Sequence, residues 1–175
     1  MKRVLSGVCC LVLCTMPALA QKKAAKAAAG AAMTDQQFVD FAAQTDMVEA
    51  NLGQMAATVG ESEEVKNYGQ TLVGDHTTDF NELYKVAQQA NLTRPNAIDD
   101  EHDKMMIDPF QKLKGAAFDK KYVHEMVAGH TKAIEVYKKE AADAQNPAVK
   151  SYAEQALPTL QKHLENAKAL EKPKK

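Results

Sequence analysis

The sequence predicts an all-α fold in which four long helices form two antiparallel hairpins joined by a shorter crossover helix. Apolar residues recur at helical spacing through almost the whole chain beyond its N-terminal region. No stretch combines sustained period-two alternation with β-branched enrichment, the pattern typical of strands. Turn and capping signals divide the chain into four long segments and one shorter segment. About 140 residues take part, which is enough for one domain around one core.

The first hairpin is predicted from two capping patterns and a tight turn. Thr34, followed by Gln37, gives a capping-box pattern at the start of a helix that stops by Gly60. A second helix starts near Ser62, has acidic residues in its first turn, and runs to about Asn91. Because the turn between them is short, we expect the two helices to be antiparallel neighbours.

The crossover is predicted as a shorter helix over residues 97–114, with Asn96 as its cap and Gly115 just past its end. About 18 residues at 1.5 Å each span about 27 Å, which carries the chain back along the bundle. The helices on either side of the crossover, over residues 63–91 and 119–144, are therefore expected to run parallel.

The second hairpin pairs the helix over residues 119–144 with a last helix. That helix opens at Asn146 and Pro147, a cap followed by a proline at the first helical position. Two antiparallel hairpins joined by one long crossover make the connectivity of a ferritin-like bundle.

Four ionisable side chains fall on the inward apolar stripes of the long helices, one on each: Glu49, His76, His130 and His163. Counting outward from the two turns places Glu49 level with His76, and His130 level with His163. The parallel alignment across the crossover brings the two pairs into register within about 5 Å. Three imidazoles and a carboxylate at one level predict a centre for one transition-metal ion, Zn, Fe, Mn, Ni or Cu.

Other polar side chains near this level are assigned lesser roles. Asp46 and Asp79 lie one turn from Glu49 and His76, so they are candidates for acceptors that orient an imidazole N–H, or for extra ligands. Asp75 is adjacent to His76 in the chain, so its side chain points about 100° away from that of His76, and it is interpreted as surface charge. His102 and His124 lie off the apolar stripes and are interpreted as solvated.

Two alternatives to the metal centre stay open. In a metal-free bundle, Glu49 accepts hydrogen bonds from the histidines and from Tyr137 or Tyr152, and the protein acts through an envelope partner or self-association. The second alternative is a metalloenzyme, in which the ion serves redox or hydrolytic catalysis and must keep an open coordination position. The sequence has no Ser/His/Asp arrangement and no Gly-rich phosphate loop, so no catalytic residue is predicted and an enzyme is the less favoured class.

Residues 1–20 have the pattern of a cleaved secretory signal, with Lys2 and Arg3 before an apolar run and a small-residue ending. That run is too short to cross a bilayer, and no later segment approaches about 20 apolar residues, so no transmembrane segment is predicted. All 3 cysteines lie within the signal, which leaves no thiolate for chemistry in the mature chain. We expect a periplasmic or secreted protein, with outer-membrane association as an alternative.

After the signal, we expect a flexible Lys/Ala-rich linker over residues 21–33, a bundle domain over residues 34–170 and a basic tail over residues 171–175. The formal net charge is −1, and it becomes −3 when the two basic residues of the signal are removed. Such a near balance predicts no binding to nucleic acid.

The chain also resembles a known family, on the basis of four segments that read FVDFAAQTDMVEANLGQMAA, VKNYGQTLVGDHTTDFNEL, FDKKYVHEMVAGH and LPTLQKHLENAKAL. Together they resemble the family called domain of unknown function 4142, exported bacterial proteins regarded as ferritin-like bundles. The resemblance covers about Thr34 to Leu170. It implies a fold and an envelope location but no substrate. Di-iron sites of ferritin-like proteins use Glu-x-x-His, and none of the three inward histidines has a glutamate three residues before it, so no di-iron centre is predicted.

Overall fold

The computed structural model describes residues 33–171. The predicted signal, almost all of the predicted linker and residues 172–175 of the predicted tail lie outside the described residues. Within the described range the chain is helical and has no strand, which confirms the predicted all-α class. The four long helices are α2 (Asp35–Val59), α3 (Glu63–Ala90), α5 (Gly115–Asp143) and α6 (Pro147–Glu171).

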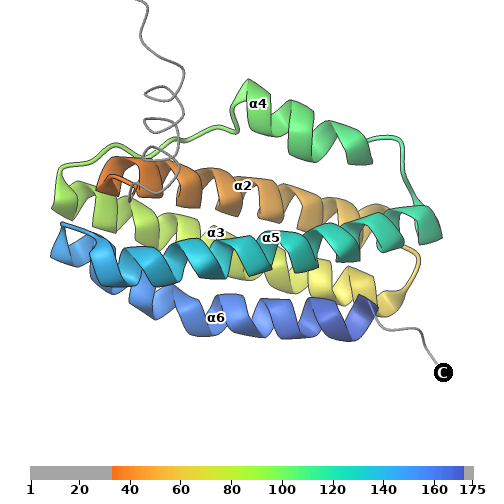
Figure 1. Cartoon of the computed structure of the whole chain (residues 1–175). Helices are drawn as coiled ribbons and strands as arrows, with labels where there is room; N and C mark the ends of the chain where they lie inside the picture. The colour runs from red at the N-terminus through yellow and green to blue at the C-terminus, as the bar shows by residue number, and fades with distance from the viewer. Residues whose placement is uncertain (1–32, 172–175) are drawn as a thin grey trace, which may run out of the picture. The chain divides into compact units, whose positions relative to one another are not determined.

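These helices pair as two hairpins, α2 with α3 and α5 with α6, and the members of each pair run in opposite directions (Figure 1). The crossover returns the chain along the bundle, so α3 and α5 run parallel, as expected (Figure 1). Contacts of α3 with α6 and of α2 with α5 close the bundle. Between residues 33 and 171, none of the helices has the length and apolar character that a membrane span requires.

The predicted ends of α2 and α3 are capped by the residues that the sequence indicated. The Thr34 hydroxyl accepts the Gln37 N–H at 3.2 Å, and the Gln37 side chain accepts the Thr34 N–H at 2.9 Å, which completes the capping box. Ser62 caps α3 by accepting the Val65 N–H at 3.3 Å. Asn91 ends α3 in the left-handed region, with φ of 55°.

Two aspartates hold the hairpins together. Asp35, at the start of α2, accepts two main-chain N–H groups of the α5–α6 turn at 3.0 and 2.9 Å. Asp119, in the first turns of α5, accepts two main-chain N–H groups of the α2–α3 turn at 3.0 and 2.9 Å. The two hairpins therefore fix each other's turns by the same type of contact, and this sets their register along the bundle.

The crossover is shorter and less regular than the predicted helix over residues 97–114. Asp99, and not Asn96, caps it, because the Asp99 carboxylate accepts the His102 N–H at 2.8 Å. Pro109 has no N–H and obstructs the preceding turn, so a regular α-helix does not continue through it. The segment consists of α4 (Asp100–His102), the π-helical η1 (Asp103–Ile107) and the 3₁₀-helical η2 (Asp108–Phe110).

Gly115 is a second correction. It does not follow the end of the crossover helix but is the first residue of α5, with φ of +60°, which a glycine adopts without strain. α5 therefore begins four residues before the predicted Asp119.

The two helices of the first hairpin approach each other closely at two glycines. A Cβ atom on Gly69 would lie 2.6 Å from the Gly53 carbonyl oxygen, and one on Gly53 would lie 2.7 Å from the Gly69 carbonyl oxygen. Only glycine at these positions allows the observed separation of α2 and α3.

The apolar core has two halves. One includes Phe38 and Leu83, and the other includes Leu52 and Leu72. Along all four long helices, the level between these halves is occupied by buried polar side chains.

Candidate metal centre

The buried polar level is formed by one side chain from each long helix. These are Glu49 on α2, His76 on α3, His130 on α5 and His163 on α6, with exposed fractions of 5, 3, 0 and 1%. The structure therefore brings together all four residues that the sequence placed at one level.

The distances between them are those of a compact cluster. One oxygen of Glu49, Oε2, lies 3.1 Å from Nε2 of His76 and 3.1 Å from Nε2 of His130. The ring centroid of His163 lies 5.2 Å from each of the other two imidazole centroids. One nitrogen from each imidazole can be chosen so that all three lie within 4.8 Å of one another.

Each imidazole is oriented by a hydrogen bond from one of its two nitrogens. His76 Nδ1 donates to Asp46 at 2.9 Å, and His130 Nδ1 donates to the Met126 carbonyl oxygen at 2.9 Å. His163 uses the opposite nitrogen, since its Nε2 donates to Asp75 at 2.8 Å. These acceptors fix the ring orientations, as partners behind metal-bound histidines do.

The remaining nitrogens have no hydrogen-bond partner among the described residues. They are His76 Nε2, His130 Nε2 and His163 Nδ1, and the same is true of Glu49 Oε2. All four atoms are buried, and the two Nε2 atoms lie 3.1 Å from Glu49 Oε2, which is an ion-pair distance when an imidazole is protonated. A buried polar atom without a compensating interaction of this kind costs free energy. This set of three nitrogens and one oxygen fits the requirements of a bound cation.

The charges of the cluster are strongly coupled. Burial alone would raise the pKa of Glu49, but its electrostatic interactions with His130 and His76 outweigh burial and lower this pKa to about 2. Burial alone would lower the pKa of His76, but the Glu49 charge and the hydrogen bond to Asp46 raise it to about 10. In the metal-free protein at neutral pH, Glu49 is therefore a carboxylate and His76 carries a proton.

Burial governs the pKa shifts of Asp46 and His163. Burial raises the pKa of Asp46 to about 7, in spite of its hydrogen bond to His76. Burial also lowers the pKa of His163, against the effect of its hydrogen bond to Asp75, so this imidazole is neutral at pH 7. A neutral imidazole is the form that binds a metal.

Two of the aspartates differ from the sequence interpretation. Asp79 accepts the Tyr152 hydroxyl at 2.7 Å and makes no hydrogen bond to an imidazole. Asp75, interpreted from the sequence as surface charge, is the partner of His163 on the facing helix. Asp75 was missed because it was compared only with its neighbour in the chain. Its position one turn before Asp79, on the same face of α3, is the signal that would have found it.

The remaining histidines lie outside the cluster, as expected. His102 is partly exposed on α4, and its Nδ1 lies 2.8 Å from the Asp99 carboxylate. His124 is exposed on α5 and lies 3.4 Å from Glu171.

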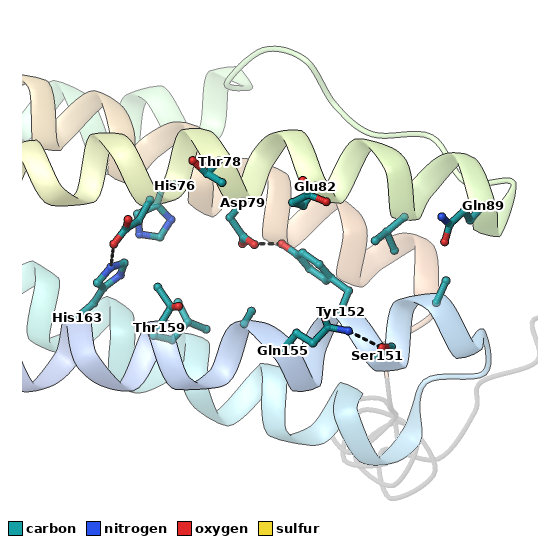
Figure 2. A pocket seen from close by; sticks show the side chains of 15 residues that line it. His76, Thr78, Asp79, Glu82, Gln89, Ser151, Tyr152, Gln155, Thr159 and His163 are labelled. Atoms are coloured by element: carbon teal, nitrogen blue, oxygen red, sulfur yellow. Dashed lines mark hydrogen bonds and ion pairs between the residues drawn. The ribbon is translucent and has the colours of Figure 1, made fainter.

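A groove of about 440 Å³ between α3 and α6 reaches the cluster. His76 and His163 line one end of it, and Asp79, Glu82 and Tyr152 line its middle (Figure 2). The buried centre therefore has an opening to the surface on the side of these two histidines.

Comparison with known proteins places this geometry in context. The model of a family described as Domain of unknown function (DUF4142) matches residues 20–170. No curated protein matches the chain.

Several solved structures share the fold. CopM in the Cu(II)-bound form has 17% identity and a TM-score of 0.66, and the alignment covers 81% of this chain and 97% of CopM. CopM in the Cu(I)-bound form has 18% identity and a TM-score of 0.65, with 78% and 94% covered. CopM in the Ag-bound form obtained by co-crystallization has 17% identity and a TM-score of 0.63, with 78% and 94% covered. At these identities the likeness concerns the fold.

Proposed function

Because the chain belongs to the DUF4142 family, whose description assigns no activity, we propose its function from its own site. The protein is an exported bundle that binds one transition-metal ion through Glu49, His76, His130 and His163. Its role is to store or buffer the metal, or to protect the cell envelope from it.

The observation that carries this proposal is that the two nitrogens of each imidazole differ in their hydrogen bonding. One nitrogen is held by a hydrogen bond, and the other is buried without a hydrogen-bond partner. In His76 and His130 this second nitrogen lies 3.1 Å from Glu49 Oε2. A metal ion would satisfy the three nitrogens and Glu49 Oε2 at once. The hydrogen bonds would meanwhile hold the rings in the orientation that binding requires.

The metal-free alternative explains these atoms less well. It requires Glu49 to be satisfied by the histidines and by tyrosines. Tyr137 and Tyr152 instead lie with their hydroxyls 3.5 Å apart, and Tyr152 donates to Asp79. Glu49 Oε2 lies 3.1 Å from two imidazole nitrogens, and among the described residues no tyrosine hydroxyl donates to it.

Cu(II) is the first candidate among the metals. Nitrogen and oxygen donors suit borderline divalent ions, and sites of this kind bind Cu²⁺ more tightly than the other first-row divalent ions. The likeness to CopM supports the same choice, since CopM has been solved with copper and with silver. Zn, Fe, Mn and Ni are the alternatives that elemental analysis would separate.

Binding without catalysis fits the donor count. Four protein donors are typical of closed metal sites, whereas catalytic sites keep one position open for water or substrate. The proposal of export rests on the signal pattern of residues 1–20, and a periplasmic or secreted protein is well placed to bind metal before it reaches the cytoplasm.

The first test is elemental analysis of mature protein purified from an exported source without chelator or affinity tag. The wild type is compared with His130→Ala and with His124→Ala, which removes an exposed histidine as a matched control. We expect about one equivalent of a single transition metal in the wild type and the control, and none in His130→Ala. Circular dichroism in chelator checks that all three proteins fold.

If the wild type contains no metal and takes up none on titration, the metal proposal is wrong. The polar layer would then be core architecture, and the function would have to be sought in association with an envelope partner or with a second copy.

A further inference from the structure

Apart from the two histidines at its inner end, the groove between α3 and α6 is lined by charged side chains of one sign. Its lining residues include the carboxylates of Asp75, Asp79 and Glu82 and no lysine or arginine. Glu82 is paired with Lys85 at 2.6 Å outside the lining, and no lysine or arginine in the lining is placed to pair with Asp75 or Asp79. A cleft lined by one sign of charge concentrates ions of the opposite sign.

The inner end of the groove is formed by ligand-type atoms. His76 and His163 both line it, both are more than nine-tenths buried, and each has one nitrogen without a hydrogen-bond partner. The acidic groove therefore leads to His76 and His163, two of the four proposed ligands.

The other sides of the centre are more tightly closed. Glu49 and His130 do not line the groove. On the side of the first hairpin, α2 and α3 approach closely through Gly53 and Gly69. On the side of α5, Gly129 lies against Glu49, since a Cβ on this glycine would be 3.5 Å from Glu49 Oε1.

Asp75 links the groove to the centre. Its side chain is 47% exposed, while its hydrogen-bond partner His163 is almost fully buried. Asp46, which orients His76, is itself buried, and the partner of His130 is a main-chain carbonyl inside α5. Of the three acceptors behind the imidazoles, only Asp75 both faces the groove and contacts solvent.

We propose that metal cations enter and leave the centre through the α3–α6 groove, and that Asp75 is the positioning residue that receives the cation and passes it to His163. This inference rests on the proposed metal-binding function and adds the route and its charge selectivity. The carboxylate attracts the cation to the groove, and the cation weakens the hydrogen bond to His163 Nε2. The imidazole is then free to adjust as its other nitrogen binds.

The charge of the groove is tested by stopped-flow loading of metal-free protein with CuCl₂ in a weakly coordinating buffer. Asp75→Asn keeps an oxygen that accepts from His163 but removes the charge. We expect the association rate to fall about threefold in Asp75→Asn and about tenfold in Asp75→Asn with Asp79→Asn at low ionic strength, and the rates to converge in about 0.5 M salt. Glu135→Gln, an exposed change on α5 outside the groove, is the matched control and should load like the wild type.

The route itself is tested by filling the groove. Thr159→Trp places a large side chain on its α6 wall, and Gln161→Trp is the control on the same helix outside the lining. Because one path serves entry and exit, Thr159→Trp should slow loading and removal by a chelator by the same factor, and Kd should not change. Gln161→Trp should slow neither.

The outcomes separate the two proposals. If the wild type binds one equivalent of Cu(II), but Asp75→Asn and Thr159→Trp load as fast as their controls, the groove is not the route and only this inference is overturned. If the wild type binds none of Cu(II), Zn, Fe, Mn and Ni, both proposals are overturned.

Discussion

Glu49→Gln is expected to destabilise the metal-free protein by about 3 kcal/mol at pH 5.5. In the wild type, Glu49 Oε2 lies 3.1 Å from two imidazole nitrogens in a buried environment. The pKa of Glu49 falls from 4.5 to about 2, and at 1.36 kcal/mol for each pKa unit this corresponds to about 3 kcal/mol of stability. The larger rise of the His76 pKa to about 10 describes much of the same attraction, so the two values are not added.

The pH dependence of this effect follows from the two shifts. Because the pKa of Glu49 is lowered, its contribution is fully present above the unfolded value of 4.5 and is lost as the pH falls toward 2. Because the pKa of His76 is raised, its contribution is fully present below the unfolded value of 6.5 and is lost as the pH rises through 10. The difference between wild type and Glu49→Gln should therefore be largest between pH 4.5 and 6.5 and should fall to about half or less by pH 9.

The assay is urea unfolding in the presence of EDTA at pH 5.5 and pH 9. With a denaturant slope of about 2 kcal/mol/M, the midpoint of Glu49→Gln should lie about 1.5 M below that of the wild type at pH 5.5. Glu135→Gln, an exposed change, should stay within about 0.5 kcal/mol of the wild type. If Glu49→Gln is as stable as the wild type at pH 5.5, Glu49 is not held by a protonated imidazole and the charge assignment of the centre is wrong.

Three further predictions concern the ligand, the helix contact and the turn. Binding of Cu(II) at pH 7 should release about one proton, because the raised pKa of His76 leaves that ring protonated in the metal-free protein. Calorimetry in buffers of different ionisation enthalpy measures the release, and its absence would contradict the protonation of His76. Gly69→Ala should lower the free energy of unfolding by about 1 to 3 kcal/mol, because the new Cβ meets the Gly53 carbonyl. Gly74→Ala, on the same helix, places its Cβ in open space and should raise the free energy of unfolding by up to about 1 kcal/mol. Equal urea midpoints for the two variants would show that α2 and α3 can separate at no cost. Asp119→Ala should lower stability by about 1 to 3 kcal/mol through the loss of two hydrogen bonds to turn amides, and an unchanged thermal midpoint would mean that this contact does not hold the hairpins.

Local chemistry explains why most helix ends could be predicted. Thr34 and Ser62 cap their helices through hydrogen bonds to residues three positions ahead. The sequence pattern that predicts the cap therefore contains the residues that form it. The crossover could not be predicted in the same way. Asn96 and Asp99 are both good caps, and the choice between them depends on tertiary contacts, including the bond from the Asp99 N–H to Gln44 on α2.

The sequence could predict that Glu49, His76, His130 and His163 lie at one level, because helical periodicity and short turns fix both the face and the level of a side chain. The partners behind them were only partly found. The Met126 carbonyl is a main-chain group that a search for polar side chains does not consider. Asp75 acts across the α3–α6 interface, and its pairing with His163 depends on how far the two hairpins are rotated against each other.

The place of the centre in the core predicts how metal and folding should be coupled. Four ionisable groups separate two apolar halves of one core, an arrangement that is costly without a compensating ion. Each long helix supplies one candidate ligand, so an ion bound by all four would join both hairpins, and its binding free energy would stabilise the whole bundle. Free metal at about one hundred times its Kd would add about 2.7 kcal/mol. A chelator should therefore lower the stability of both hairpins together. If only one hairpin loses protection from hydrogen exchange when the metal is removed, the ion binds on one face and is not held by the four-residue centre.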